Sequence, residues 1–354
     1  MIQKFVKKVF VNGYGSIGSR ITQFIADDFD IELVGVGKYS PDDKVRDALS
    51  RGFNVYVPKN KLELFKNFRI SGTVEDAVEK SDLVIDAALG GHGYLNKKNL
   101  YEPKNMRAIF QGGETIAGEK AVADFIFNSR VNYEEAFDKK YAMQGSCNVT
   151  GMGRVLQPLR EKYGKKIKRF DATLIRRWAD LEDSKTQVKD SIEWSRKPHH
   201  QDDVKSYMGK DTQLFVRAFK VPTRQMHLHL LDVRFNDAAP KPSEILDLFR
   251  NEYGVATLYT AKGTKDIRDF AESTKFSLKD TNMIHIHADL LEVQDDVVKI
   301  TYSDDQTGIV IPENHLLMQA MLFKRSRHDA FKHTEDLFHM EEKKKLLEQH
   351  FGPR

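Results

Sequence analysis

The stretch Lys8–Gly18, which reads KVFVNGYGSIG, decides the fold of the N-terminal half of this chain. Its first five residues are typical of a buried strand, and apolar residues at helical spacing follow the glycines. A second apolar strand is predicted at Ile31–Val36. A strand, a helix and a strand in this length form a β-α-β unit, whose crossover makes the two strands parallel.

Three glycines between the first strand and the helix have the spacing of a dinucleotide-binding loop. Gly13 permits a tight turn, Gly15 lets the backbone approach a pyrophosphate, and Gly18 lets the helix close on the strand. The phosphates then lie at the helix N-terminus, where free N–H groups bind anions. The alternative is a glycine-rich turn without a ligand, which the position inside a β-α-β unit disfavours.

Short strands alternate with helices as far as residue 145, and the pattern then changes. Before that point we predict strands at 55–57, 83–87, 107–110 and 141–143, with helices at 42–51, 74–80 and 96–101. After it we predict a helix at 151–163, longer strands at 170–177, 213–221, 226–235, 283–291 and 297–302, and helices at 243–253 and 264–273. The fold class is therefore α/β: a doubly wound parallel Rossmann sheet over 1–145, an α+β domain with a mainly antiparallel sheet over 146–310, and a helical segment over 311–354.

The composition fits a globular protein with two cores. The chain has 354 residues, 40% of them apolar and 31% charged, and chains of this length usually form two domains. The net charge of +4 is a small difference between 56 basic and 52 acidic residues, so we expect no nucleic-acid partner. The start, Met1–Lys8, lacks the apolar core of a signal peptide, and no apolar run is long enough for a membrane helix. The single cysteine excludes an intramolecular disulfide, and we expect a soluble cytoplasmic protein.

The end of the second predicted strand carries the residue that usually distinguishes NAD from NADP. An Asp or Glu there binds the ribose hydroxyls, but this strand ends in Val36-Gly37-Lys38 without an acid. The ammonium of Lys38 could pair with the 2′-phosphate of NADP, or Lys38 could be a solvated surface lysine. The sequence favours NADP, with NAD also accepted.

The cysteine, Cys147, lies in MQGSCNVTG at a junction between a predicted strand and a helix. A helix N-terminus stabilises a thiolate over a thiol, and a thiolate can attack an aldehyde carbon. Backbone N–H groups of the same turn could bind the oxyanion that forms. A lone cysteine is more often a small buried apolar residue, but its polar, glycine-bounded neighbours favour a nucleophile.

A cysteine nucleophile needs a group that handles protons, and His227 and His229 are the candidates. Alternate residues of a strand point to one face, so the residues alone leave both histidines open. His285 and His287 form a second such pair. Because no carboxylate or cysteine ligand clearly accompanies the pairs, we predict no metal site.

Several cations follow the cysteine in the sequence and are suited to a phosphorylated substrate. They are Arg176, Arg177, Arg224, His199 and His200. An arginine can bind a phosphate through two parallel hydrogen bonds. Without the cysteine and the nucleotide fold, the same cations would be read as an ordinary solvated cluster.

Six blocks, in this order, resemble the archaeal-type (class II) glyceraldehyde-3-phosphate dehydrogenases. They are Asn12–Gly18, Phe110–Glu114, Ser146–Gly151, Arg176-Arg177, Met226–His229 and Ile311–Asn314, and the resemblance extends to about Leu322. It implies oxidation of D-glyceraldehyde 3-phosphate with inorganic phosphate and NADP or NAD to 1,3-bisphosphoglycerate, in glycolysis or gluconeogenesis. It also implies a homotetramer and a C-terminal segment, 311–354, that packs back on the nucleotide domain.

The resemblance also assigns roles to single residues. Cys147 is expected to form the thioester, and His227 is expected to be the catalytic histidine. The cofactor is expected to contact Ser16, Ile17, Gly113, Arg177 and Gln306, besides Gly13, Gly15, Gly18 and Lys38. The substrate is expected to contact Ser146, Cys147, Asn148, His200 and Gln201, with Arg176 from the cluster of cations.

The chain departs from the family pattern at three places. Val149 stands where the family usually has threonine, His199–Asp203 reads HHQDD where the family has HHGPD, and Asp304–Gly308 reads DDQTG where the family has an HQES run. These departures concern the phosphate contacts and the range of substrates. Two other functions stay open: a related semialdehyde or acyl-phosphate reductase, and a non-catalytic nucleotide-binding regulator, against which the retained Cys147 and His227 argue.

Overall fold

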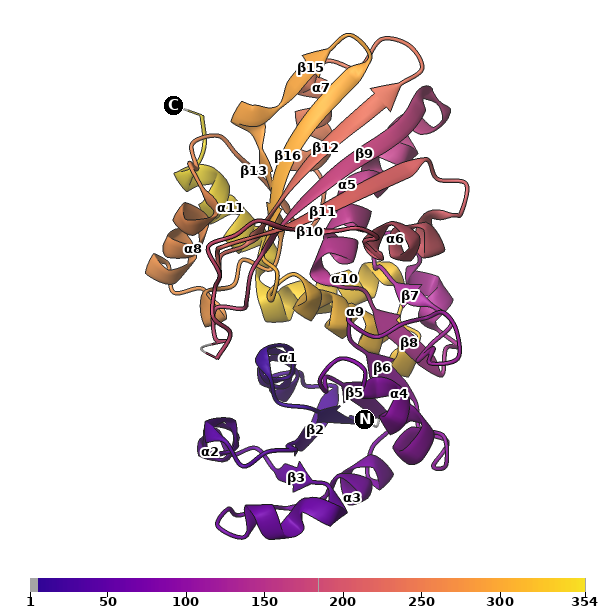
Figure 1. Ribbon diagram of the computed structural model, residues 1–354, viewed down its shortest axis with the longest axis vertical. Helices are drawn as coiled ribbons and strands as arrows, with labels where there is room; N and C mark the ends of the chain where they lie inside the picture. The colour runs from indigo at the N-terminus through magenta and orange to yellow at the C-terminus, as the bar shows by residue number, and fades with distance from the viewer. Residues whose placement is uncertain (1–5, 184, 354) are drawn as a thin grey trace, which may run out of the picture. The chain divides into compact units, whose positions relative to one another are not determined.

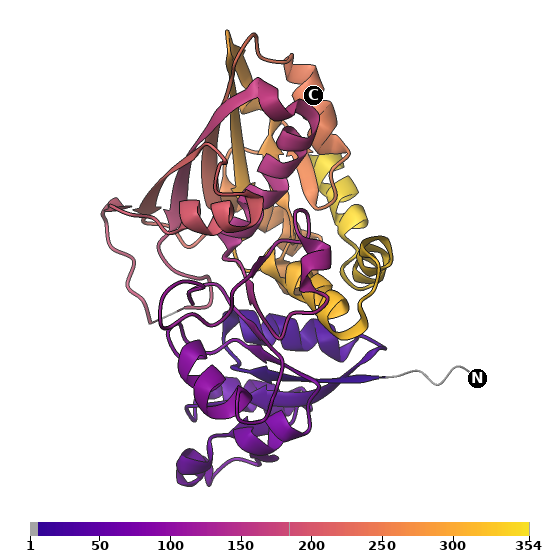
Figure 2. The same cartoon turned by 90° about the vertical axis from the view of Figure 1, so that its right-hand side faces the viewer.

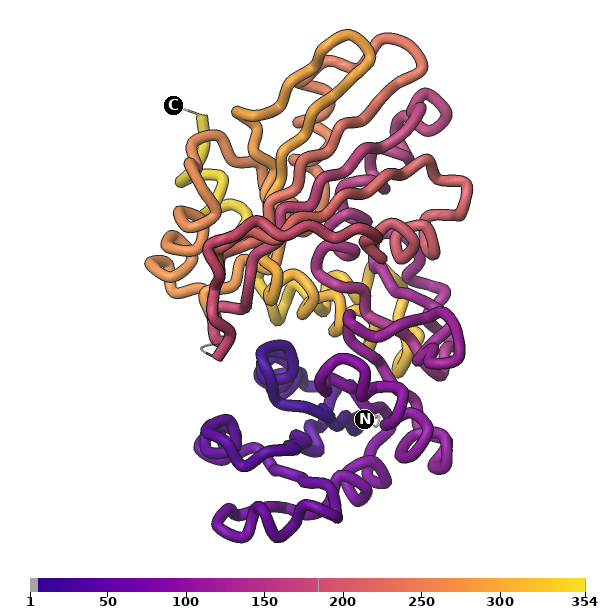
Figure 3. Tube along the Cα trace, viewed as in Figure 1, coloured from indigo at the N-terminus to yellow at the C-terminus, as the bar shows by residue number. Residues whose placement is uncertain are grey.

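The structure, a computed structural model, describes residues 6–183 and 185–353. Most of the segment in which no signal peptide was expected, Met1–Phe5, therefore lies outside the described residues. The chain forms two compact units (Figures 1 and 3). The first contains the residues up to Ser146 together with Glu313–Leu337, and the second contains Cys147–Pro312 together with the residues from Phe338 onward. None of the described helices is both long and apolar enough to cross a membrane.

The first unit is built on a parallel sheet, as the alternation of short strands and helices predicted. Its eight described strands are β1 (Lys7–Asn12), β2 (Ile31–Gly37), β3 (Val55–Val57), β4 (Gly72–Thr73), β5 (Leu83–Asp86), β6 (Ala108–Phe110), β7 (Ile126–Phe127) and β8 (Tyr141–Gln144). They are all parallel, in the order β4-β3-β2-β1-β5-β6-β8-β7. The order reverses between β1 and β5, the place where open α/β sheets bind nucleotides.

Helices and short turns connect these strands. The helices are α1 (Ser16–Ala26), α2 (Asp43–Ser50), α3 (Val74–Glu79) and α4 (Gly93–Asn96), and the turns are η1 (Lys59–Phe65), η2 (Lys97–Tyr101) and η3 (Tyr133–Ala136). The strands β4 and β7 were not predicted, because two residues are too few to show a periodicity. Thr73 caps α3 through a reciprocal pair of hydrogen bonds with Asp76, which fixes where that helix begins.

The second unit is built on a mixed sheet. Its described strands are β9 (Ile167–Arg177), β10 (Glu193–Ser195), β11 (Leu214–Val221), β12 (His227–Phe235), β13 (Val255–Leu258), β14 (Ile284–His287), β15 (Glu292–Gln294) and β16 (Val297–Asp304). The order is β10-β11-β9-β12-β16-β14-β13, with β15 beside β16. Most neighbours are antiparallel, as predicted, but β11 with β9 and β13 with β14 are parallel.

Helices pack against one face of this second sheet, and Figure 2 shows α5 and α7 on the same side of it. The described helices are α5 (Cys147–Tyr163), α6 (His200–Met208), α7 (Pro242–Arg250) and α8 (Thr264–Ser273), with short turns η4 (Gly164–Lys166), η5 (Ser277–Lys279) and η6 (Ala288–Leu290). Along β12 buried residues alternate with more exposed ones, which is the period of a strand with one covered face. The strand predicted over 283–291 is too long, because the chain turns into η6 after His287.

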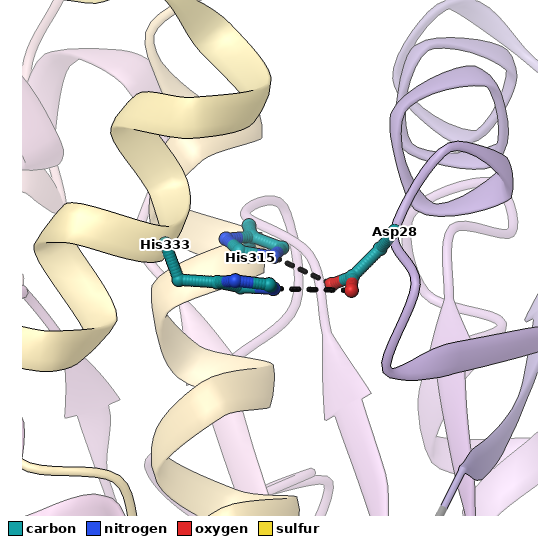
Figure 4. Close-up of side chains that lie close together, drawn as sticks. All are labelled: Asp28, His315 and His333. Atoms are coloured by element: carbon teal, nitrogen blue, oxygen red, sulfur yellow. Dashed lines mark hydrogen bonds and ion pairs between the residues drawn. The ribbon is translucent and has the colours of Figure 1, made fainter. Parts of the chain in front are cut away.

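Two C-terminal helices, α9 (Val310–Phe323) and α10 (Arg327–Phe338), contribute residues to the first unit. His315 of α9 and His333 of α10 both point at Asp28, which follows α1 (Figure 4). Their Nε2 atoms lie 2.9 and 3.0 Å from the two carboxylate oxygens. Because all three side chains are buried, this carboxylate joins both helices to the end of α1.

The last helix, α11 (Met340–His350), belongs to the second unit. Glu348 accepts hydrogen bonds from the backbone N–H and the hydroxyl of Thr257 in β13, at 2.8 and 3.1 Å. Lys344 donates to the carbonyls of Arg250 and Glu252, at 2.6 and 3.1 Å. The prediction that all of 311–354 packs on the nucleotide domain is therefore wrong for α11, since side chains of this helix satisfy backbone groups of the second unit.

Candidate active site

The glycine loop has the geometry that dinucleotide binding requires. Gly13 has a φ of +124°, and a Cβ there would lie 2.4 Å from the carbonyl oxygen of Ala87. A Cβ on Gly18 would lie 1.9 Å from the carbonyl oxygen of Gly13, so both positions require glycine. A Cβ on Gly15 would meet nothing within 4 Å. The first-unit residues in front of Gly15 thus leave room for a pyrophosphate.

The N-terminus of α1 completes this loop. The helix begins at Ser16, with Ile17 next, and its N-cap residue Gly15 provides no side-chain hydrogen bond. The first N–H groups of a helix have no partner within the helix and attract anions. The loop therefore fits the phosphates of a nicotinamide dinucleotide, the group for which the sequence predicted it.

Lys38 lies just after β2, where it was expected, but its ammonium is already paired. Lys38 Nζ lies 2.7 Å from Asp42 Oδ1, and the lysine side chain is only 8% exposed. The same Asp42 oxygen accepts the backbone N–H of Lys44 and caps α2. The residues of the strand end alone do not show that the turn after β2 brings the Asp42 carboxylate back to Lys38.

Two other residues expected at the cofactor lie in different units. Gly113 follows β6 with a φ of +112°, and a Cβ there would meet nothing within 4 Å. Gln306 follows β16 and is buried. Neither its amide oxygen nor its amide nitrogen has a hydrogen-bond partner among residues 6–183 and 185–353. Buried amides are normally hydrogen-bonded, so Gln306 is suited to a ligand.

Cys147 is the first residue of α5, so this helix begins four residues before the predicted start at Gly151. Ser146, the preceding residue, packs against the loop after β6: a Cβ on Gly112 would lie 2.6 Å from Ser146 Cα. The Cys147 Sγ atom lies 3.2 Å from Nε2 of His227. The amide nitrogen of Asn148 lies 3.7 Å from the same sulfur.

The register of β12 decides between the two candidate histidines. His227 begins the strand and contacts the thiol, whereas Nε2 of His229 lies 2.9 Å from Oδ1 of Asn148. The two rings are nearly parallel, with centroids 6.2 Å apart. The other nitrogen of His227, Nδ1, lies 3.1 Å from the backbone nitrogen of Arg177 in β9. His227 is therefore the histidine next to the sulfur, and His229 orients Asn148.

Burial dominates the protonation of this pair. Burial, and then the carboxyl of Asp304, raise the pKa of the Cys147 thiol to about 12. Burial, and then the guanidinium of Arg177, hold the pKa of His227 well below its usual range. The resting pair is thus a thiol beside a neutral imidazole. Burial therefore opposes the stabilisation of the thiolate that the helix N-terminus was expected to provide.

Asp304, the last residue of β16, was not predicted to be a site residue. Its side chain is fully buried, and neither carboxyl oxygen has a hydrogen bond within the described part of the chain. Donor atoms of Cys147, His227 and Asp304 all lie within 4.8 Å of one another. Burial, and then the neighbouring Asp305, raise the pKa of Asp304 to about 8. The departure from the family's HQES run was the available signal for this residue.

The structure separates the predicted cations into those near the thiol and those elsewhere. Arg176 and Arg177 end β9, and Nε of Arg176 is buried without a partner among the described residues. His200 begins α6 and is also buried, and burial lowers its pKa, an effect to which the charge of Arg176 adds. Arg224 instead donates to the backbone carbonyls of Asp180, Asp183 and Thr186, so it holds a loop.

Gln201 is directed to another part of the second unit. Its amide oxygen accepts the backbone N–H of Val216, at 3.2 Å. It lines a cavity of about 580 Å³ with Thr173, Phe215 and Leu230. Val149, the other departure in this region, is buried, and its carbonyl accepts the hydroxyl of Tyr207 at 2.7 Å.

Comparison with known proteins places these features in a family, although no family model matches the chain. The chain is 33% identical over 336 residues to the glyceraldehyde-3-phosphate dehydrogenase of Saccharolobus solfataricus, which covers 93% of this chain and 96% of the relative. It is also 33% identical to the enzyme of that name from Sulfolobus acidocaldarius, over 93% of this chain and 96% of the relative. The identity to the enzyme of that name from Methanothermus fervidus is 33%, over 90% of this chain and 94% of the relative. The chain belongs to the archaeal-type glyceraldehyde-3-phosphate dehydrogenase family.

Proposed function

We propose that this protein is a phosphorylating glyceraldehyde-3-phosphate dehydrogenase that works through a thioester on Cys147. The observation that carries the proposal is the 3.2 Å approach of Cys147 Sγ to His227 Nε2 in a chain of this family. A sulfur nucleophile next to a ring nitrogen is the arrangement that covalent aldehyde oxidation needs. The family membership makes a nicotinamide dinucleotide the expected cofactor.

Cys147 begins the reaction by forming a bond to the aldehyde carbon. His227 is placed to stabilise the hemithioacetal oxygen by a hydrogen bond as that oxygen gains negative charge. The N–H groups that begin α5 and the amide of Asn148 are suited to hold that oxygen. The bound nicotinamide supplies the hydride acceptor. Cys147 then carries a thioester, from which inorganic phosphate releases 1,3-bisphosphoglycerate. Arg176 and Arg177 supply the positive surroundings that phosphate groups prefer, and His200 is a neutral hydrogen-bonding group beside them.

We propose that both NADP and NAD are used, with a moderate preference for NADP. Lys38 is the expected contact to the 2′-phosphate, but a phosphate has to share its ammonium with Asp42. A shared cation binds each anion less strongly than a free one. By the family resemblance we also propose a homotetramer.

A direct assay tests the proposal. Purified protein is given glyceraldehyde 3-phosphate, inorganic phosphate and either cofactor, and the reduced cofactor is followed by absorbance. The acyl phosphate is trapped with hydroxylamine. We expect turnover that depends on phosphate and is lost in Cys147→Ser. Steady oxidation of glyceraldehyde 3-phosphate without phosphate would reject the proposal. So would a higher kcat/KM for a semialdehyde or for another acyl phosphate than for glyceraldehyde 3-phosphate or 1,3-bisphosphoglycerate.

A further inference from the structure

The hydrogen bonds of His227 fix where its proton lies. Its Nδ1 atom lies 3.1 Å from the backbone nitrogen of Arg177. A backbone N–H can only donate, so Nδ1 must accept. In the neutral ring the single hydrogen is then on Nε2, which faces Cys147 Sγ at 3.2 Å. His227 is thus a hydrogen-bond donor toward the sulfur.

This arrangement prevents His227 from taking the thiol proton. Nε2 already carries a hydrogen, and a second hydrogen on Nδ1 would point at the N–H of Arg177. Burial and the neighbouring Arg177 also disfavour the doubly protonated ring. The same hydrogen on Nε2 argues against a metal ion between Cys147, His227 and Asp304, because a ligating nitrogen needs a free lone pair. The thiol proton therefore needs another acceptor.

Asp304 is the nearby carboxyl group whose oxygens make no hydrogen bond within the described residues. A buried carboxyl without a hydrogen bond costs free energy, so such a group needs an explanation. Helix α5 leaves space for it, since a Cβ on Gly151 would lie 3.3 Å from Asp304 Oδ2. The ionisable groups around it are Cys147 from α5, His227 and His229 from β12, Arg177 from β9, and Tyr302 and Asp305 from its own segment, with His229 Nε2 at 3.7 Å.

We propose that Asp304 accepts the proton of the Cys147 thiol during attack on the aldehyde, while His227 donates a hydrogen bond to the forming oxyanion. The S–H bond breaks and its proton moves to a carboxylate oxygen. The sulfur lone pair forms the S–C bond, and the carbonyl π pair moves to oxygen. When the acyl group leaves, the thiolate regains the proton from the Asp304 carboxyl. The separation of at most 4.8 Å is closed by a bridging water or a rotation of the carboxyl group.

The role of Asp304 rests on the proposed function, and its test is the dependence of kcat/KM on pH. In the wild type we expect kcat/KM to rise as the carboxyl ionises, around its pKa of about 8, and then to level off. Asp304→Asn should lose this inflection and fall by about 100-fold or more. Asp304→Glu should regain the inflection, and Asp171→Asn, which removes a half-buried carboxylate from β9, should behave as the wild type.

A second measurement needs no substrate. The chain has one cysteine, so its reaction with an aromatic disulfide reports Cys147 alone. In the wild type we expect the rate to rise with pH up to the pKa of Asp304 and to be constant above it, because the Asp304 carboxyl and the Cys147 thiol share one proton. In Asp304→Asn the rate of reaction with the disulfide should keep rising with pH through and above this pKa, without a plateau. This result stands even if the protein oxidises another aldehyde.

Two outcomes would overturn the inference. One is an Asp304→Asn variant, folded by circular dichroism, that keeps both the inflection and a rate within a few-fold of the wild type. The other is an inflection that survives in Asp304→Asn and disappears in His227→Asn, because the histidine would then be the acceptor. A His227→Asn variant that is slow but keeps the inflection supports the inference, since it separates the hydrogen-bond donor from the proton acceptor.

Discussion

Replacing Asp28 by Asn should destabilise the first unit without touching the thiol site. The Asp28 carboxylate accepts hydrogen bonds from Nε2 of His315 and His333 at 2.9 and 3.0 Å, and from the backbone N–H of Asp30 at 2.8 Å. The amide of Gln319 adds a longer one, at 3.3 Å. An asparagine has the same shape but only one accepting oxygen, and its NH2 group would face a donor.

The magnitude follows from these contacts. At least one charge-assisted hydrogen bond is lost, worth about 1.5–3 kcal/mol, and a buried donor is left unsatisfied at a cost of about 1–3 kcal/mol. The sum is about 2.5–6 kcal/mol, a range that includes the usual cost of about 3–5 kcal/mol for removing one partner of a buried ion pair. For a domain of this size, 3 kcal/mol corresponds to a fall in Tm of roughly 6–12 °C.

The assay uses two optical signals of the full chain. Far-ultraviolet circular dichroism reports both units, whereas both tryptophans, Trp178 and Trp194, lie in the second unit. We expect the dichroism midpoint to fall in Asp28→Asn and the tryptophan midpoint to move less. Asp27→Asn, an exposed neighbour, is the control and should change neither midpoint by more than about 2 °C.

The dependence on pH gives an independent check. Burial alone would raise the pKa of Asp28, but the hydrogen bonds from His315 and His333 outweigh it and hold this pKa well below its usual range. A carboxyl with a lowered pKa stabilises the folded state above its unfolded pKa, and this contribution is lost as the pH falls through the folded pKa. The difference between wild type and Asp28→Asn should therefore shrink in acid. A dichroism midpoint that Asp28→Asn leaves unchanged at neutral pH would refute the reasoning.

Three further predictions concern catalysis. Cys147→Ser should abolish oxidation and leave cofactor binding intact, measured by fluorescence titration, because the glycine loop and the cysteine are separate motifs; near-normal turnover would remove the thioester mechanism. His227→Asn should lower kcat by about 100-fold or more and His229→Asn by much less, because only His227 contacts the sulfur; the reverse order in steady-state kinetics would exchange their roles. Lys38→Met should lower the NADP-to-NAD ratio of kcat/KM by about tenfold, or 1.4 kcal/mol, because it removes a cation and frees Asp42; an unchanged ratio at low salt would mean that Lys38 does not contact the cofactor.

The parts of the fold that were predictable are those set by local sequence. The β-α-β unit at Lys8–Val36 follows from apolar periodicity and from the three spaced glycines. At two of them, Gly13 and Gly18, the structure leaves no room for a Cβ atom. Packing partners were less predictable. The helix α11 was assigned to the wrong unit, because an amphipathic helix shows that it has an apolar face and does not show which domain will cover it.

Side chains whose position depends on several strands could not be read from the sequence. The choice of His227 over His229 follows from the pairing of β12 with both β9 and β16, in which His227 stands opposite Asp304. Asp304 itself is far from Cys147 in the sequence, and the sequence showed it only as part of a departure from the family's HQES run. Gln201 was expected at the substrate, but its amide binds the backbone of β11, a contact that depends on how α6 packs.

Protonation was the least predictable property, because it depends on which backbone group meets each polar atom. The same histidine next to the same sulfur is a base if Nδ1 faces a carbonyl and a donor if Nδ1 faces an N–H. In this chain strand β9 presents the N–H of Arg177. A strand register that presented a carbonyl would reverse the role of His227 without changing one residue of the motif. The motif therefore identifies the nucleophile and its neighbour, while the strand beside them determines the direction in which the proton moves.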